Sequence, residues 1–192
     1  MKSTVALSLL IMGALITAQG CEGRLISEGM EKGLGPTGIA LPIDPKLPPG
    51  DSLAAYRNIE LAAIRVEFPD TPPTFVSDFQ RKFYDQLAGK NLPQDRGGKT
   101  LLVNVTILAY QPAVSYHKAL GPTEEVVARV ELTDKSTGAV VGRAICIGRT
   151  FQSVGMSVKW KAWGLSRAIV NNMIDPHYPK AGRHEAAEEG AE

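Results

Sequence analysis

The histidines are the first residues to test for chemistry, because imidazole serves both as a metal ligand and as a general base. The chain has three of them, His117, His177 and His184. None is paired with another His or Cys at the three- or four-residue spacing of a helical zinc site. His177 follows Pro176, and His184 lies near the C-terminus, so both are expected to be solvated. We expect no bound metal and no other cofactor.

The segment Gly97-Gly98-Lys99-Thr100 contains the glycine, lysine and hydroxyl residues that end a phosphate-binding loop. That motif also requires a glycine five residues before Gly98, where this chain has Pro93. A phosphate-binding loop leads into a helix, whereas the residues after Thr100 alternate as in a strand. The sequence therefore excludes this kind of site.

Carboxylate pairs offer general acid–base chemistry, but none here is placed to share a substrate. Glu124 and Glu125 are consecutive in an expected strand, so their side chains point to opposite faces. Asp78 and Asp85 lie on an expected helix, where both are predicted to face solvent. The sequence also lacks the Gly-x-Ser-x-Gly turn that often presents a serine nucleophile. We expect no enzymatic activity; a hydrolase with dispersed residues has no support from the sequence.

The thiol of Cys21 is the remaining candidate, and its chemistry is acylation. Lys2 provides a positive start, and Val5–Ile16 form an apolar run of about twelve residues, which is too short to span a bilayer. Gly20, a small residue, directly precedes the cysteine. This arrangement resembles the bacterial lipobox, in which the thiol is diacylated and the peptide is cut before the cysteine. We therefore expect residues 1–20 to be a lipoprotein signal peptide.

Ordinary cleavage at the same place is the alternative. Ala18 and Gly20 also form the small-x-small pattern of signal peptidase sites, and such cleavage would leave a soluble periplasmic or secreted protein. Ala18 and Gln19 differ from the residues usual in a lipobox, which are Leu and Ala or Ser. The chain has only two cysteines, so a cysteine directly after a plausible cleavage site favours lipidation. Two or more acyl chains would anchor the protein stably in a membrane.

The second cysteine, Cys146, has no partner once Cys21 is acylated. It lies in an apolar strand pattern, and we expect a small buried hydrophobe and not a reactive thiol. The charges nearly balance, at 21 basic and 20 acidic residues, and become 20 and 20 when Lys2 is removed. A neutral chain without a basic run argues against nucleic acid as a partner.

Composition divides the chain into four parts. After the signal peptide, residues 21–55 are rich in Gly and Pro, and we expect a tether there. The alternative is a segment that becomes ordered on a partner. Residues 56–178 have the length of one domain and are expected to form a periplasmic α/β domain. Residues 179–192 are acidic and are expected to be a disordered tail.

Hydrophobic periodicity predicts four strands and two helices in this domain. In the order β-α-β-β-β-α, they predict an α+β fold: a two-layer sandwich with a four-stranded, largely antiparallel sheet and two helices on one face. The expected elements are a strand at Tyr56–Phe68, a helix from Pro72 to Gly89 capped by Thr71, strands at Thr100–Tyr110, Glu124–Thr133 and Ala139–Thr150, and a helix at Lys159–Ile174.

Phe75, Phe79, Phe83 and Leu87 recur every four residues and form an apolar stripe on the first helix. We expect this stripe to pack in the core. The alternative is that the helix covers an apolar pocket on the sheet, which would make the protein a periplasmic small-molecule or lipid-binding module.

Two segments are candidate interaction surfaces. The loop that follows Gln111 is longer than a hairpin needs and carries Tyr116, His117 and Lys118. Trp160 and Trp163 stand with lysines at the start of the last helix, where one Trp would pack on the sheet and the other would be exposed to a partner or to lipid headgroups. An ordinary surface loop is the alternative for the first segment.

The order of these parts resembles small bacterial lipoproteins with an uncharacterised periplasmic α/β domain, distantly like the periplasmic domain of the curli-secretion lipoprotein. The resemblance covers Tyr56–Ile174 and includes the hairpin turn Asp134-Lys135-Ser136-Thr137-Gly138. The connection Lys90–Lys99 is too short for the long hairpins of the pore-forming relatives, so a channel is not implied. Glu22 follows the cysteine in place of an inner-membrane retention aspartate, and the resemblance then implies the outer membrane, facing the periplasm.

From these features we expect a lipid-anchored, non-enzymatic protein that docks onto an envelope protein as an accessory component of an assembly. A soluble periplasmic or secreted protein is the alternative for its location, and a ligand-binding module is the alternative for its function.

Overall fold

The computed structural model describes residues 35–95, 97–111, 124–150 and 157–179 of the chain. These residues form an α+β domain with five strands and two main helices. The elements are β1 (Thr37–Ile43), β2 (Asn58–Val66), α2 (Thr74–Gly89), β3 (Thr100–Tyr110), β4 (Glu124–Asp134), β5 (Val140–Thr150) and α4 (Ser157–Ile169), which continues as a π-helical turn (Val170–Ile174) and a 3-10 turn (Asp175–His177).

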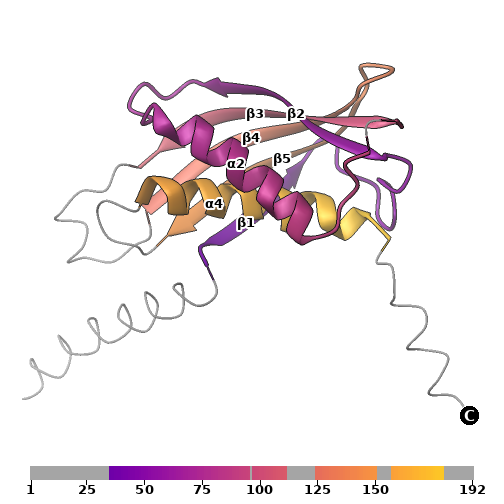
Figure 1. The fold of residues 1–192 in the computed structure, drawn as a ribbon. Helices are drawn as coiled ribbons and strands as arrows, with labels where there is room; N and C mark the ends of the chain where they lie inside the picture. Colours follow the sequence, from indigo (N-terminus) through magenta and orange to yellow (C-terminus); the bar gives the residue numbers. More distant parts are fainter. Residues whose placement is uncertain (1–34, 96, 112–123, 151–156, 180–192) are drawn as a thin grey trace, which may run out of the picture.

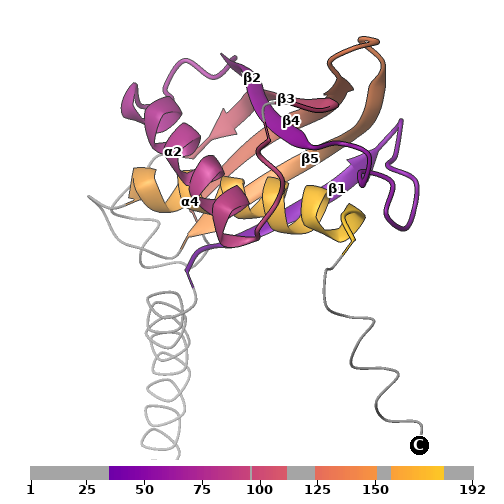
Figure 2. The same ribbon diagram turned by 45° about the vertical axis from the view of Figure 1, so that its right-hand side comes forward.

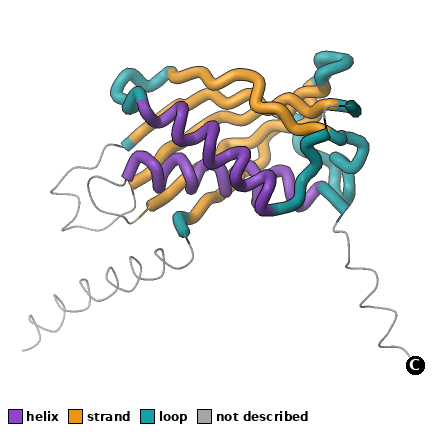
Figure 3. The backbone as a smooth tube through the Cα atoms, viewed as in Figure 1, coloured by secondary structure: helices purple, strands orange, loops and turns teal. Residues whose placement is uncertain are grey.

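A single mixed sheet forms one layer of the domain, with strand order β1-β5-β4-β3-β2. All neighbouring strands are antiparallel except β2 and β3, which are parallel. The chain therefore crosses over between β2 and β3 through α2. Both helices lie side by side on the same face of the sheet (Figures 1 and 2). Figure 3 shows the same two layers by element type, and this confirms the predicted two-layer arrangement.

The fifth strand corrects the sequence prediction of four. β1 lies within residues 21–55, which were expected to be a tether, and it pairs along its whole length with β5, from Thr37 opposite Arg149 to Ile43 opposite Arg143. Its Pro42 is tolerated because β1 is an edge strand. Further along the same stretch, Leu53 is fully buried. Residues 35–55 thus belong to the domain, while the expected tether before residue 35 lies outside the described part.

The strands that were expected from periodicity are confirmed. β3 has the predicted bounds, and its apolar face is fully buried at Leu101, Val103 and Ile107. The other face, which includes Asn104 and Thr106, is half-buried and lies on the side away from the helices. β4 and β5 form the predicted hairpin, and Gly138 in its turn has the left-handed φ of 70° that the turn requires.

Helix α2 carries the predicted core stripe: Phe75, Phe79, Phe83 and Leu87 are all fully buried. Its start differs from the prediction. The helix begins at Thr74, and the hydroxyl of Thr71 donates to the carbonyl oxygen of Phe68 at 2.8 Å, so Thr71 does not cap it.

The two aspartates of α2 were expected to face solvent, and one of them does not. Asp78 is only 8% exposed and accepts a hydrogen bond from Arg81 in the next turn. The helix therefore turns this carboxylate toward the protein and balances it locally. Asp85 is exposed and pairs with Lys82 at 3.2 Å.

Helix α4 lies unusually close to the sheet because glycines line the contact. A Cβ atom on Gly148 of β5 would lie inside the backbone of Leu165, and a Cβ on Gly38 of β1 would lie inside the backbone of Ala168. On the helix, a Cβ on Gly164 would lie 2.9 Å from the carbonyl oxygen of Thr37. Backbone therefore meets backbone at this crossing, and no side chain can be inserted between them.

We predict that Gly148→Ala lowers the free energy of unfolding by about 1–3 kcal/mol, because the new methyl group must displace α4 from the sheet. Urea denaturation followed by far-UV circular dichroism measures this loss. Gly89→Ala is the matched control, since a Cβ at Gly89 meets nothing within 4 Å; there the stability should stay the same or rise by up to about 1 kcal/mol. Equal effects of the two substitutions would show that the close contact does not matter.

Candidate interaction site

The described residues next to the two predicted interaction surfaces, the end of β3 and the start of α4, lie at one end of the sheet. β3 ends at Tyr110, directly before the loop, and α4 begins at Ser157. Lys161 of α4 connects the two segments, because its Nζ donates to the carbonyl oxygen of Gln111. Tyr116, His117 and Lys118 themselves lie outside the described residues, so their predicted role stays a prediction.

Lys161 is one of the lysines that the sequence places beside Trp160 and Trp163 at the start of this helix, and its side chain is fully buried. Removing an ammonium group from water is costly unless polar groups replace its hydration. Here the Gln111 carbonyl accepts one hydrogen bond, and the ring of Tyr110 lies 4.4 Å from Nζ, within the range of a cation–π interaction. Lys161 therefore fixes the end of β3 against the start of α4. The sequence did not predict that Tyr110 contacts Lys161, because a tyrosine at the end of a strand gives no indication of a lysine packed against its ring.

Trp160 and Trp163 are both half-buried, and their ring centroids are 5.2 Å apart. The cation beside them is Lys82 of α2, whose Nζ lies 5.5 Å from the Trp163 ring, and not one of the neighbouring lysines that the sequence suggested. The indole nitrogen of Trp163 is buried and has no hydrogen-bond partner in the described residues.

Trp163 holds the first described residues of the chain against α4. A Cβ atom on Gly35, which has a left-handed φ of 78°, would lie 2.7 Å from the Trp163 ring. One turn later on the helix, Arg167 donates to the carbonyl oxygen of Pro36 at 2.9 Å. Trp163 therefore serves a contact inside the domain, and Trp160 is the better candidate of the two for contact with a partner.

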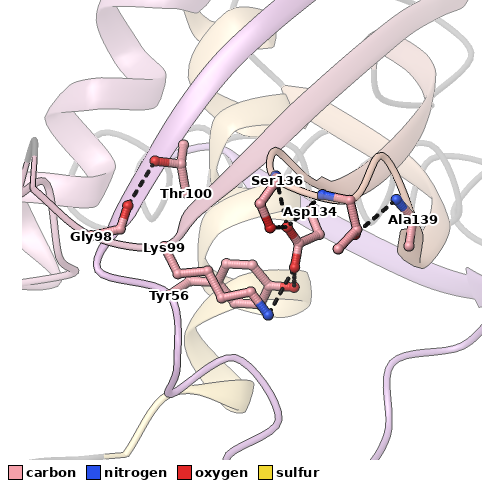
Figure 4. A network of polar contacts seen from close by, with 8 residues as sticks. Tyr56, Gly98, Lys99, Thr100, Asp134, Ser136 and Ala139 are labelled. Carbon is pink, nitrogen blue, oxygen red and sulfur yellow. Dashed lines mark hydrogen bonds and ion pairs between the residues drawn. The ribbon is translucent and has the colours of Figure 1, made fainter.

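A second polar cluster, formed by Tyr56, Lys99 and Asp134, lies at the opposite end of the sheet (Figure 4). Asp134 is buried, with 3% of the residue exposed. One carboxylate oxygen accepts from the Tyr56 hydroxyl at 3.1 Å and pairs with Lys99 Nζ at 2.8 Å. The other accepts from the backbone N–H and the hydroxyl of Ser136, at 2.9 and 2.6 Å.

This cluster explains two features of the sequence. The Asp-x-x-Thr-Gly turn needs its aspartate because the carboxylate bonds the turn backbone from within. Lys99, from the rejected phosphate-loop segment, is committed to Asp134 and lies 4.7 Å from the Tyr56 ring. Hydrogen bonds from Lys99 and Ser136 hold the pKa of Asp134 far below its usual range. The cluster joins the start of β2, the start of β3 and the end of β4.

The remaining sequence candidates have structural roles where they are described. Cys146 is fully buried, as predicted, and burial raises its thiol pKa to about 12. His177 was expected to be solvated but is half-buried, with its Nδ1 3.1 Å from the Ser52 hydroxyl. The described residues contain no cluster of His, Cys, Asp and Glu that could hold a metal ion. Cys21, His117 and His184 lie outside the described ranges.

None of the helices in the described ranges is long and apolar enough to cross a membrane.

Comparison with known proteins gives a likeness of fold. No protein-family model matches the chain, and no curated protein matches it in sequence. The structure of the PelC dodecamer from Paraburkholderia phytofirmans is 14% identical, with a TM-score of 0.50, and the match covers 75% of this chain and 99% of that chain. A variant of the same PelC dodecamer is 15% identical, with a TM-score of 0.49 and the same coverage. A minor lipoprotein from Acinetobacter baumannii is 16% identical, with a TM-score of 0.30, over 59% of this chain and 92% of that chain.

Protonation of Asp134 is expected to destabilise the domain. Because its pKa is lower in the folded protein than the unfolded value of about 3.9, its contribution is complete above that pH and is lost as the pH falls below it. We predict that Asp134→Asn lowers the thermal midpoint at pH 7 and that the difference from the unmodified protein shrinks toward pH 2.5. Circular dichroism melts across this range measure it.

Asp70→Asn is the control, since Asp70 is exposed and lies outside this cluster. A difference for Asp134→Asn that stays as large at pH 2.5 as at pH 7 would contradict the assignment.

Proposed function

We propose that this protein is a non-enzymatic lipoprotein of the cell envelope, anchored through Cys21, whose α+β domain docks onto another envelope component. The observation that carries the proposal is the position of the first described residues. Trp163 and Arg167 hold Gly35 and Pro36 on α4, one turn from Trp160. The point where the chain enters the described domain therefore lies close to Trp160 on the same helix.

The length of the anchor segment supports a role close to the membrane. About 14 residues separate Cys21 from Gly35, and a fully extended chain of that length spans at most about 50 Å. Two or more acyl chains on Cys21 would keep the protein attached, since a single chain binds only marginally. By the resemblance to bacterial lipoproteins, Glu22 after the cysteine supports a location on the periplasmic face of the outer membrane.

The proposed docking surface consists of Trp160 and the loop with Tyr116, His117 and Lys118. Half-buried aromatic side chains on rigid elements are typical anchors of protein interfaces. Trp160 stands on a helix whose first turns are fixed by the buried Lys161. The similarity in fold to PelC adds one specific partner to test: the PelC structure is a dodecamer, so a second copy of this chain is a candidate alongside a different envelope protein.

The ligand-binding alternative was based on an apolar pocket between α2 and the sheet, and side chains fill that space. Phe75, Phe79 and Phe83 are fully buried side chains that fill the space between α2 and the sheet. A hollow of about 270 Å³ lies between β1 and the π-helical turn, and Leu47 and Met173 contribute to its lining. An apolar small molecule or a lipid chain could bind in that hollow, whose lining includes these two apolar side chains.

The anchor is tested by the mass of the mature protein extracted from membranes. We expect an N-terminal peptide that begins at Cys21 and carries acyl chains. Cys21→Ser should prevent this modification and release the protein from the membrane fraction. An unmodified Cys21 in the mature chain would contradict the lipid anchor and favour a soluble periplasmic or secreted protein.

Docking is tested by Trp160→Ala. We predict that in-cell cross-linking and mild-detergent purification recover a stoichiometric partner with the unmodified protein, and that the substitution weakens this association by roughly 30-fold, the loss typical of a truncated aromatic anchor. The thermal midpoint should change little.

Tyr84→Ala is the matched control, because Tyr84 is a 40% exposed aromatic residue on the other helix. Equal losses from both substitutions, or recovery of the bare protein from unmodified cells, would argue against this surface.

A further inference from the structure

A polar groove lies on the face of the sheet that is opposite the helices. It has a volume of about 340 Å³, and its lining comes from the three strands β2, β3 and β4. Its lining includes Ala63, Arg65, Asn104, Thr106, Arg129, Glu131 and Thr133. All of them stand on strands, so the groove is built on a rigid scaffold.

The strand register places two arginines in one row across the groove. Arg65 of β2 lies opposite Thr106 of β3, and Thr106 lies opposite Arg129 of β4. Paired residues of neighbouring strands point to the same face, so the two guanidinium groups flank the Thr106 hydroxyl. In the next row, the small Ala63 lies opposite Asn104, and this leaves the hollow beside the arginines.

The guanidinium group of Arg129 extends across β3 toward β2. Its Nη2 lies 3.9 Å from Glu67, the residue that follows β2, and both side chains are more than half exposed. A contact at this distance and exposure stabilises little. Arg65 is exposed and has no ion-pair partner among the residues that the structure describes. Two positive groups thus lie near each other with only one loosely held carboxylate.

The other charged residue of the groove is already neutralised. Glu131, which lies opposite Asn104, pairs with Arg143 of β5 at 2.6 Å. The amide of Asn104 donates to the hydroxyl of Thr133 at 3.3 Å, which orients this pair on the floor of the groove. Asparagine is depleted in strands, and its place in the middle of a central strand is not explained by the core.

We propose that this groove binds an oxyanion of the phosphate class. Each guanidinium group offers a planar fork of N–H donors that matches phosphate oxygens. The Thr106 hydroxyl between the two forks adds a neutral donor, and the bound anion removes the repulsion between Arg65 and Arg129. The site is separate from the proposed docking surface and does not depend on the anchor.

The test uses isothermal titration calorimetry of the full-length protein, purified from membranes in mild detergent, with inorganic phosphate at constant ionic strength. We expect saturable binding of one equivalent. Arg65→Gln and Arg129→Gln should each weaken it roughly tenfold, through loss of one charge-assisted contact, and the double substitution should abolish it. Glycerol 1-phosphate in place of phosphate distinguishes a lipid headgroup from a free anion by which of them binds more tightly.

Arg57→Gln is the matched control, since Arg57 is exposed, precedes β2 and does not line the groove. It should leave the affinity unchanged. Ala63→Leu fills the hollow without changing charge and should also prevent binding. The proposal is overturned if phosphate shows no saturable binding up to about 10 mM, a weak limit for a specific site, or if the groove substitutions and Arg57→Gln have equal effects. Tighter binding of acetate than of phosphate would also overturn the assignment to the phosphate class.

Discussion

The close approach of α4 to the backbones of β1 and β5 is the constraint on which the rest of the domain depends. It is possible only because Gly38, Gly148 and Gly164 carry no side chain at the crossing. With the helix this close, β1 is hydrogen-bonded along one edge to β5, and α4 covers one of its faces. The same contact brings Trp163 and Arg167 onto the residues that precede β1, so packing in the core determines where the chain enters the domain.

A buried charged residue links neighbouring elements at each end of the sheet. One of these residues is an aspartate and the other is a lysine. Asp134 joins the starts of β2 and β3 to the turn after β4. Lys161 joins the end of β3 to the start of α4. Asp134 is bonded by Tyr56, Lys99 and Ser136, and Lys161 by the Gln111 carbonyl and the Tyr110 ring, which offsets the cost of removing these charges from water. These two polar clusters stabilise the fold. The polar groove on the open sheet face has no such structural role in the described residues.

Periodicity predicted the elements that have one regular apolar face. β3 and α2 each bury an apolar side chain at every second or every fourth position, and these patterns survive in the sequence without tertiary knowledge. β1 could not be found in this way, because it has proline and glycine within seven residues and is stabilised by pairing with a strand about a hundred residues later. The burial of Lys161 and Asp78 was missed for a similar reason: their partners come from tertiary packing or from a side-chain orientation that composition does not show.

The pairing of β1 with β5 also sets an order of events during synthesis. The first strand leaves the ribosome early, but its partner strand ends at Thr150 and the helix that covers it ends at Ile169. Until those later segments have followed, the backbone groups of β1 have neither their partner strand nor the helix that covers it. During that time it is an open edge exposed to other chains. The domain can therefore close only when almost all of the chain is present, and β1 lacks its partner strand until then.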